Sequence, residues 1–151
     1  MPGLSHEPWV TGTAEVGPPQ LFGSAQGFER RCVPILSGTF SGRISGHGLP
    51  GGTDWQRIWP DGTTELEAHY AWETDQGEYL EVFSNGIRSG PEAAMRDLLA
   101  GKAVDPSLIY FRSAMRFVTS APRLKDFAGR LFIGVGRREP ARVLLDVYAV
   151  E

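Results

Sequence analysis

Short segments in which apolar and polar residues alternate, each followed by a turn rich in glycine or proline, recur along the chain from residue 21 to residue 150. Alternation with a period of two places neighbouring side chains on opposite faces of a β-strand. The turns, such as Pro50-Gly51-Gly52 and Asp75-Gln76-Gly77, are only a few residues long. Because connections this short join antiparallel neighbours, the chain is predicted to form an antiparallel β-sheet.

The alternating segments predict about eight or nine strands. They cover residues 21–28, 31–40, 42–49, 54–59, 63–74, 78–85, 109–119, 130–136 and 143–150. Pro34 has no backbone N–H and therefore predicts a sheet edge or a β-bulge in the second segment. A sheet of this size either packs as a sandwich or closes on itself, and closure removes the exposed edges. We therefore predict an all-β protein, an antiparallel β-barrel with one short helix.

The helix is predicted at residues 91–100. Pro91 suits the first helical position, Met95, Leu98 and Leu99 form one apolar stripe, and Gly101 follows the last turn. Helices shorter than about 12–15 residues are marginal on their own. We therefore expect this helix to dock its stripe on the sheet as a cover over one end of the barrel.

The chain has 151 residues, which is the length of one ordinary domain. Residues 1–19 contain four prolines and no strand or helix period, so they are expected to form an extended lead-in tethered by Trp9. The barrel is expected to occupy residues 20–151.

Composition and missing motifs argue against several classes of protein. The net charge of −3 provides no basic surface for nucleic acid, and the single Cys32 excludes an internal disulfide and a cysteine-rich zinc site. The first residues lack the regions of a secretory signal, and no apolar run is long enough for a membrane helix. Nucleotide-binding, phosphate-binding and serine-hydrolase motifs are missing. We expect a cytoplasmic protein without cofactor or metal that binds a small molecule, as a monomer or a homodimer.

Four motifs carry a resemblance to a known family. They are Gly46-His-Gly-Leu-Pro-Gly-Gly-Thr-Asp-Trp55, Ser84-Asn-Gly-Ile-Arg-Ser-Gly-Pro91, Tyr110-Phe-Arg-Ser113 and Leu131-Phe-Ile-Gly-Val-Gly136. In this order and spacing they resemble the DUF3237 family, also called UPF0311, over roughly residues 20–151. The resemblance implies an antiparallel β-barrel with one short helix and implies little about chemistry. Many relatives carry another basic or polar residue where this chain has His69, so a histidine base would be particular to this chain.

Two positions near turns offer polar side chains for chemistry. Asp54 follows a glycine pair, where the backbone can bend sharply or approach a ligand closely, and it is either a cap for the turn or a catalytic carboxylate. Its neighbour Trp55 is either a core residue or the wall of a binding pocket. Asn85 and Arg88 stand between a strand and the helix, at a predicted barrel rim where an arginine could hold a carboxylate or an enolate.

Strand alternation does not decide whether the other candidate side chains face the barrel interior or the solvent. Tyr110 and Arg112 share one face of their strand, and Phe111 and Phe117 share the other. The first pair forms either a solvated outer surface or, facing inward, an anion site with the phenol as an acid. His69 shares its face with acidic residues and is either solvated or a base oriented by a carboxylate.

The first functional hypothesis is a cofactor-independent enzyme that moves protons on an apolar, oxygenated or enolisable small molecule, as isomerases, cyclases and lyases do. Asp54 or His69 would be the base, Tyr110 the acid, and Arg88 or Arg112 the holder of the developing oxyanion. The residues expected to bind the substrate are Trp55, Tyr70, Trp72, Asn85 and Arg88. The second hypothesis is a non-catalytic carrier or sensor, and the third is a barrel packed solid that serves only interactions.

Overall fold

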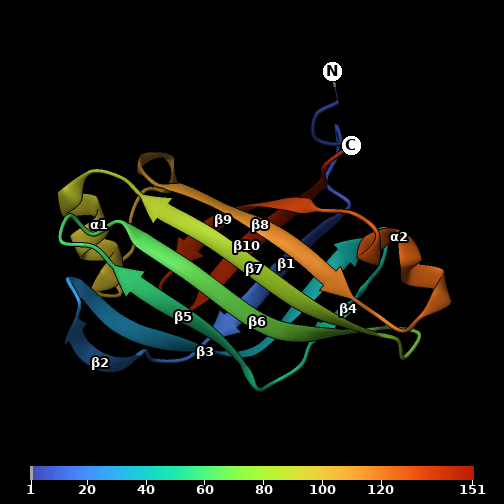
Figure 1. Cartoon of the computed structure of the whole chain (residues 1–151), viewed down its shortest axis with the longest axis horizontal. Helices are drawn as coiled ribbons and strands as arrows, with labels where there is room; N and C mark the ends of the chain where they lie inside the picture. The colour runs from blue at the N-terminus through green and yellow to red at the C-terminus, as the bar shows by residue number, and fades with distance from the viewer. Residues whose placement is uncertain (1) are drawn as a thin grey trace.

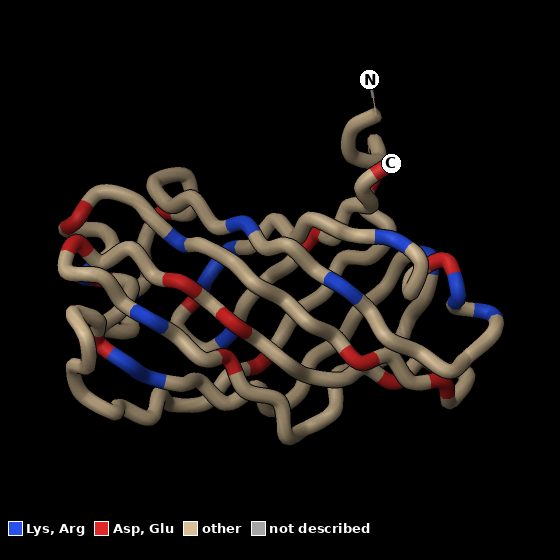
Figure 2. The backbone as a smooth tube through the Cα atoms, in the orientation of Figure 1, with Lys and Arg blue, Asp and Glu red and all other residues tan. Residues whose placement is uncertain are grey.

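Residues 2–151, the part of the chain that the computed structural model describes, contain ten β-strands, eight of which form a closed, elongated barrel (Figure 1). The strands are β1 (Val10–Val16), β2 (Gln20–Ala25), β3 (Phe28–Gly42), β4 (Gly46–Gly48), β5 (Gly52–Ile58), β6 (Thr64–Thr74), β7 (Tyr79–Ser89), β8 (Tyr110–Val118), β9 (Phe132–Glu139) and β10 (Arg142–Ala149). Acidic and basic residues are interspersed along them in the view of Figure 2. Neither sign of charge therefore dominates this side of the barrel.

Eight strands close the ring, in the order β1, β3, β5, β6, β7, β8, β9 and β10, with β10 returning to β1. All pairings are antiparallel. The short strand β4 pairs with β3 and β6, the same two neighbours that β5 has. Strand β2 pairs with β3 and extends the sheet outside the ring. The predicted antiparallel β-barrel of about eight or nine strands is confirmed.

Strand β1 closes the barrel although it lies in the segment expected to be a lead-in. Val10 pairs with Val147 of β10 on one side and with Gly42 of β3 on the other. The expected start of the barrel at residue 20 is therefore corrected to β1. Gly12 and Ala14 line the barrel interior with side chains too small to produce an apolar alternation, which explains why the sequence pattern did not reveal this strand.

The irregularity expected near Pro34 is present in β3. Glu15 of β1 pairs with Ser37, whereas the next residue, Val16, pairs with Ile35. One residue of β3 is therefore left over between the two pairs, as in a β-bulge. The bulge lets β3 bend between its partners β1 and β5.

A short helix covers each end of the barrel (Figure 1). Helix α1 (Glu92–Leu99) confirms the predicted helix and buries Met95 and Leu98. Helix α2 (Lys125–Ala128) follows a 3₁₀ turn and buries Phe127 at the opposite end. The sequence predicted only a connection here, because a single helical turn is too short to show an apolar period. Neither helix in residues 2–151 is long and apolar enough to cross a bilayer.

The barrel interior is packed at the α2 end. An aromatic cluster fills this part, and Trp9 contacts Phe127 and Phe132 edge-on at ring distances of 5.2 and 5.4 Å. Trp72 stacks on Phe40 at 4.3 Å and bounds the cluster. Towards α1 the interior instead holds a cavity with charged side chains, so the barrel is not packed solid.

Candidate functional site

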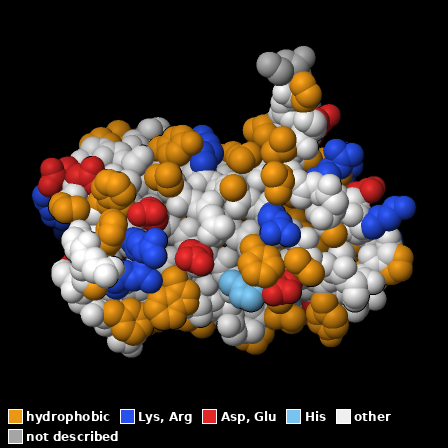
Figure 3. Space-filling model, viewed as in Figure 1, with side chains coloured by type: hydrophobic (Ala, Val, Ile, Leu, Met, Phe, Trp, Pro, Cys, Tyr) orange, Lys and Arg blue, Asp and Glu red, His pale blue; other side chains and the backbone are white. Residues whose placement is uncertain are grey.

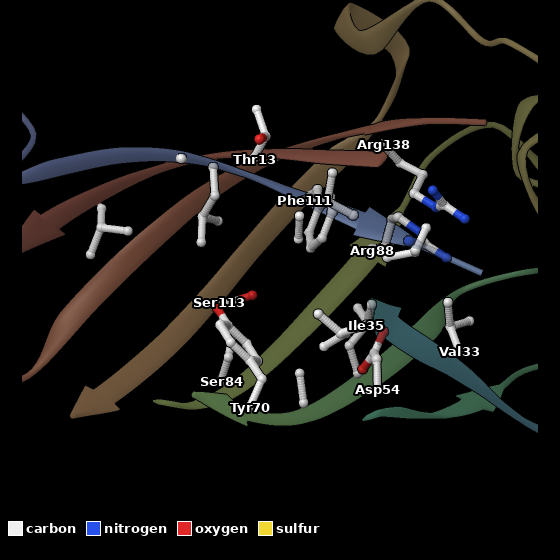
Figure 4. A pocket seen from close by; sticks show the side chains of 18 of the residues that line it. Thr13, Val33, Ile35, Asp54, Tyr70, Ser84, Arg88, Phe111, Ser113 and Arg138 are labelled. Carbon is white, nitrogen blue, oxygen red and sulfur yellow. The ribbon is translucent and has the colours of Figure 1, made fainter. Parts of the chain in front are cut away.

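The cavity inside the barrel has a mainly apolar wall and one charged end. Its apolar lining comes from strands all around the ring and includes Val33, Ile35, Leu66, Ala68, Trp72, Phe111, Val143, Leu145 and Val147. Asp54, Arg88 and Arg138 lie together at one end, while Tyr70, Ser84 and Ser113 lie away from them (Figure 4). The volume of about 80 Å³ is several times what one ordered water needs. The cavity therefore has room for more than one water, and its mainly apolar wall with a few polar groups is a lining of the kind that small-molecule sites have.

Asp54 points into this cavity because it occupies an inward position of β5. Its Oδ2 accepts a 2.8 Å hydrogen bond from Nε2 of Gln56, which lies two residues further along the same face. Its Oδ1 is buried and has no hydrogen-bond partner among the described residues. Burial raises the pKa of the Asp54 carboxyl, and the Gln56 hydrogen bond and the nearby arginine charges oppose that rise only in part. Asp54 is thus a carboxyl with one fixed oxygen and one oxygen available to a ligand.

Arg88 is the most deeply buried charged residue of the cavity, with 1% of its surface exposed. Its guanidinium lies 5.4 Å from the centre of the Phe111 ring. Its Nε and Nη2 are buried and find no acceptor within residues 2–151. Burial lowers the pKa of Arg88 to about 9, and the charge of Asp54 opposes this change, so the guanidinium stays protonated at neutral pH. Arg88 therefore offers two N–H donors in an apolar setting.

Two further arginines add positive charge at this end. Arg31 of β3 is buried, donates from Nε to Oε1 of Gln56 at 2.7 Å and from Nη1 to the carbonyl of Leu99 at 3.2 Å. A continuous hydrogen-bonded chain thereby links the last turn of α1 to Asp54. Arg138 of β9 lines the cavity, and its Nη1 donates to the carbonyl of Arg142 at 3.3 Å. Burial lowers the pKa of both arginines.

Tyr70 and Trp72 lie on the inward face of β6, where the sequence interpretation expected substrate-binding residues. Burial, together with the charge of Asp54, raises the pKa of the Tyr70 phenol, so it keeps its proton throughout the neutral range. Trp72 is 7% exposed and forms the boundary between the cavity and the aromatic core. Tyr70 can therefore act as a hydrogen-bond donor to a ligand, whereas Trp72 forms part of the apolar wall of the cavity.

Four of the expected site residues lie on the outside of the barrel, and their expected place in the cavity is corrected. Trp55, Asn85, Tyr110 and Arg112 line a separate, open groove on the outer surface. Arg112 donates from Nη1 to its neighbour's carbonyl and lies over the ring of Tyr110, which is 55% exposed. Successive side chains of a strand point to opposite faces. Because Phe111 and Ser113 occupy inward positions of β8, Tyr110 and Arg112 point outward.

His69 is also on the outer surface, so its expected role as a base in the cavity is corrected. The ring stacks on Phe83 at 4.4 Å, and Nε2 lies 2.6 Å from Oε1 of Glu81. Tyr70 takes the inward position next to it, which leaves the outward position to His69. The outer face there mixes hydrophobic, acidic and basic side chains around a histidine (Figure 3). His69 and Asp54 therefore cannot act on the same ligand in the cavity.

The sequence interpretation missed several residues that line or support the cavity: Arg31, Gln56, Ser84, Ser113 and Arg138. For Arg31, Gln56, Ser84 and Ser113 the period of two contained the signal, because each lies two residues from an inward position of the same predicted segment. Arg138 lies beyond the predicted segment 130–136, because β9 continues to Glu139. Gln56, for example, is two residues from Asp54. In residues 2–151 no group of three or more His, Cys, Asp or Glu side chains is arranged to hold a metal ion.

Comparisons with known proteins find a matching family and a similar protein along nearly the whole chain. The family described as "Protein of unknown function (DUF3237)" matches residues 4–150. A UPF0311 protein of Rhodopseudomonas palustris strain TIE-1 is 43% identical over 150 residues, which cover 99% of this chain and 98% of that protein.

Solved structures share the barrel. The crystal structure of a conserved protein of unknown function from Rhodopseudomonas palustris has a TM-score of 0.91 at 42% identity and covers 100% of this chain and 99% of its own. A structure described as an enzyme from Penicillium herquei has a TM-score of 0.72 at 18% identity, over 99% of this chain and 96% of its own, and shares the fold. With family motif, full-length relatives and barrel in agreement, the chain belongs to the DUF3237 family, also called UPF0311.

Proposed function

We propose that this barrel is a cofactor-independent enzyme that moves a proton on a small, mainly apolar and enolisable substrate. The observation that carries the proposal is the buried, unpartnered Oδ1 of Asp54 in the same cavity as the unpartnered Nε and Nη2 of Arg88. A carboxylate base and a guanidinium donor together are what removal of a proton next to a carbonyl group requires. A distant relative in fold is called an enzyme, which agrees with a catalytic use of the barrel.

The proposed reaction needs one base and one stabiliser of negative charge. Ionised Asp54 takes a proton from the carbon beside the carbonyl. The electron pair of the broken C–H bond forms a C=C bond, and the π pair of the carbonyl moves onto its oxygen. Arg88 and Arg138 donate hydrogen bonds to that oxygen as its charge develops. Return of the proton to another atom completes an isomerisation, and loss of a leaving group completes an elimination. A general base of this kind accelerates a reaction by about 10²–10⁴-fold, and a hydrogen-bond donor to the developing oxyanion by about 10²–10³-fold.

The raised pKa of Asp54 suits this role. A base is most effective when its pKa is close to the working pH, and burial moves that of Asp54 upward from its ordinary value. The Gln56 hydrogen bond holds Oδ2, so Oδ1 is left to receive the proton. Tyr70, which keeps its own proton, is placed to donate a further hydrogen bond to the ligand.

Deuterium exchange tests the proposal without knowledge of the natural substrate. 2-Tetralone, an apolar ketone with acidic C–H bonds, is incubated with the protein in D₂O, and deuterium uptake at the carbons beside the carbonyl is followed by proton NMR. We expect exchange above the buffer rate with the wild type and a loss of about 10²-fold or more with Asp54→Asn. The matched control is Asp75→Asn, at an exposed turn, which should exchange like the wild type.

Two results would overturn the proposal. Exchange that survives Asp54→Asn and disappears in His69→Asn would assign the base to the outer face. Saturable binding of 2-tetralone in the cavity without any exchange would favour a carrier with the same barrel.

A further inference from the structure

The charged end of the cavity holds more positive than negative charge. Three arginines, Arg31, Arg88 and Arg138, lie near one cavity acid, Asp54, and Glu29 is a second acid whose charge acts on Arg31. The ion pairs found in residues 2–151 involve other arginines, so none of the three is neutralised by direct contact with an acid. Unpaired charge in a low-dielectric interior is costly. An anionic ligand would offset that cost.

The unpartnered atoms of Arg88 specify the shape of that anion. Nε and Nη2 lie on the same edge of the planar guanidinium, so their N–H bonds point outward as a parallel pair. A carboxylate presents two oxygens with the matching spacing and accepts both hydrogen bonds at once. The guanidinium carbon lies 5.4 Å from the centre of the Phe111 ring, and both residues line the cavity.

The rest of the cavity specifies the body of the ligand. Beyond the charged end the wall is aliphatic and aromatic, with Val33, Ile35 and Leu145 among its residues. A strongly hydrated anion such as inorganic phosphate gains nothing from such a wall, whereas a carboxylate on a hydrocarbon body gains from both parts.

We infer that the cavity binds an apolar organic carboxylate whose two oxygens bridge Nε and Nη2 of Arg88. This inference rests on the proposed function only for the use made of the ligand: the carboxylate orients the molecule so that an acidic C–H bond faces Asp54. With both free donors of Arg88 on the carboxylate, Arg138 takes over the stabilisation of the charge that develops on a separate carbonyl oxygen. The substrate class is then a small carboxylic acid with an enolisable carbon. The inference that the carboxylate binds depends only on the free donors of Arg88 and on the apolar wall of the cavity.

A pair of matched probes tests the charge requirement. Phenylacetate and phenylacetamide have the same size and shape and differ in charge, and phenyl phosphate offers the competing anion. Binding of each to the wild type is measured by NMR titration. We expect phenylacetate to bind at least about tenfold more tightly than either of the others. Equal affinity for the amide, or tighter binding of phenyl phosphate, would overturn the inference.

The ¹⁵Nε–H signal of Arg88 reports the contact directly in the unmodified protein. Phenylacetate should shift this signal and leave that of Arg116, on the outward face of β8, in place. The absence of any shift at Arg88 at saturating phenylacetate would contradict the inference. Because this readout needs no substitution, it holds even where a variant fails to fold.

Two substitutions distinguish the contribution of charge from that of the paired donors. Arg88→Met should abolish the preference for phenylacetate over phenylacetamide, and Arg88→Lys should retain only part of it because lysine keeps the charge without the paired donors. Arg116→Met is the control and should keep the full preference.

The outcomes for binding and for exchange are separable. Selective binding of phenylacetate without deuterium exchange of 2-tetralone would support the carboxylate site and contradict the proposed enzymatic function. Exchange of 2-tetralone without carboxylate preference would retain the enzyme and assign it a neutral substrate.

Discussion

Asp54 has two oxygens with different surroundings, and this difference is the central fact at the scale of single residues. Oδ2 accepts a hydrogen bond from Gln56, which itself accepts one from Arg31, whereas Oδ1 is buried without a hydrogen-bond partner among the described residues. Holding one oxygen fixes the plane of the carboxyl group and so fixes the direction in which the other oxygen can accept a proton. A base with a fixed direction needs no reorganisation when the substrate arrives.

Replacement of Asp54 by asparagine should stabilise the protein in a pH-dependent way. Since burial raises the pKa of Asp54, the folded state keeps a proton there in a range where the unfolded state has lost it. Wild-type stability therefore falls as the pH rises from about 3.9 through the raised pKa, and stays constant above it. Asp54→Asn lacks this dependence. Its Tm advantage in thermal melts should grow over that range and then level off, and Asp75→Asn should show none.

Loss of the Gln56 hydrogen bond should shift the pH profile of the proposed reaction. That bond lowers the pKa of Asp54, so Gln56→Leu should move the pH dependence of 2-tetralone exchange to higher pH. A purely structural role would reduce the rate at every pH and leave the profile in place. Gln76→Leu, in an exposed turn, is the matched control and should leave both rate and profile unchanged.

Strand parity explains which site residues could be predicted and which could not. Asp54, Tyr70, Trp72 and Arg88 line the cavity, whereas the neighbours proposed with them point outward. Asn85 and Arg88, for instance, are three residues apart and cannot both face inward in one regular strand. The alternation was readable from the sequence, but which face is the inner one depends on closure of the whole sheet.

At the scale of elements, helix α1 joins the cover of the barrel to the site beneath it. Its apolar side buries Met95 and Leu98, and the carbonyl of Leu99 in its last turn accepts a hydrogen bond from Arg31. Arg31 in turn holds Gln56. The position of this short helix therefore determines how the polar chain that ends at Asp54 is arranged.

Truncation of the docked side chain should measure how firmly α1 is held. Leu98 is 7% exposed, so Leu98→Ala should lower the free energy of unfolding by about 2–5 kcal/mol in urea denaturation. Leu108→Ala removes the same atoms from a residue that is 49% exposed and should cost about 0.5 kcal/mol or less. Equal costs for the two variants would show that α1 does not depend on Leu98.

Elements with a clear alternation were predictable, and those built from small residues or single turns were not. Strands β6 and β8 coincide closely with the predicted segments, as does α1, whereas β7 continues to Ser89, four residues beyond its predicted end at residue 85. Asn85 and Arg88 therefore lie within β7 and not between a strand and the helix, as was predicted. β1 was not recognised because its inward positions include Gly12 and Ala14, and α2 was not because one turn has no period. Both elements that the sequence did not reveal complete the barrel. Strand β1 closes the ring between β10 and β3, and α2 covers one end.

At the scale of the whole molecule, the seam between β1 and β3 depends on close backbone approach. A methyl group on Gly38 of β3 would overlap the backbone carbonyl of Thr13 in β1. Gly38→Ala should therefore lower the free energy of unfolding by about 1–3 kcal/mol in urea denaturation. Gly3→Ala meets nothing within 4 Å and should leave it unchanged. A tolerated Gly38→Ala would mean that this seam opens without cost.

The pairing of β1 with β10 also sets the order of events during synthesis. β1 is made first and can pair early with β3, but its second partner is made last. At about 5–20 residues per second, the ribosome needs on the order of ten seconds to bridge that interval. Throughout it, the inner walls of the barrel and the open edge of β1 are exposed to other chains. The nascent protein is therefore most vulnerable to aggregation just before its last strand emerges, and a holding chaperone would be most useful then.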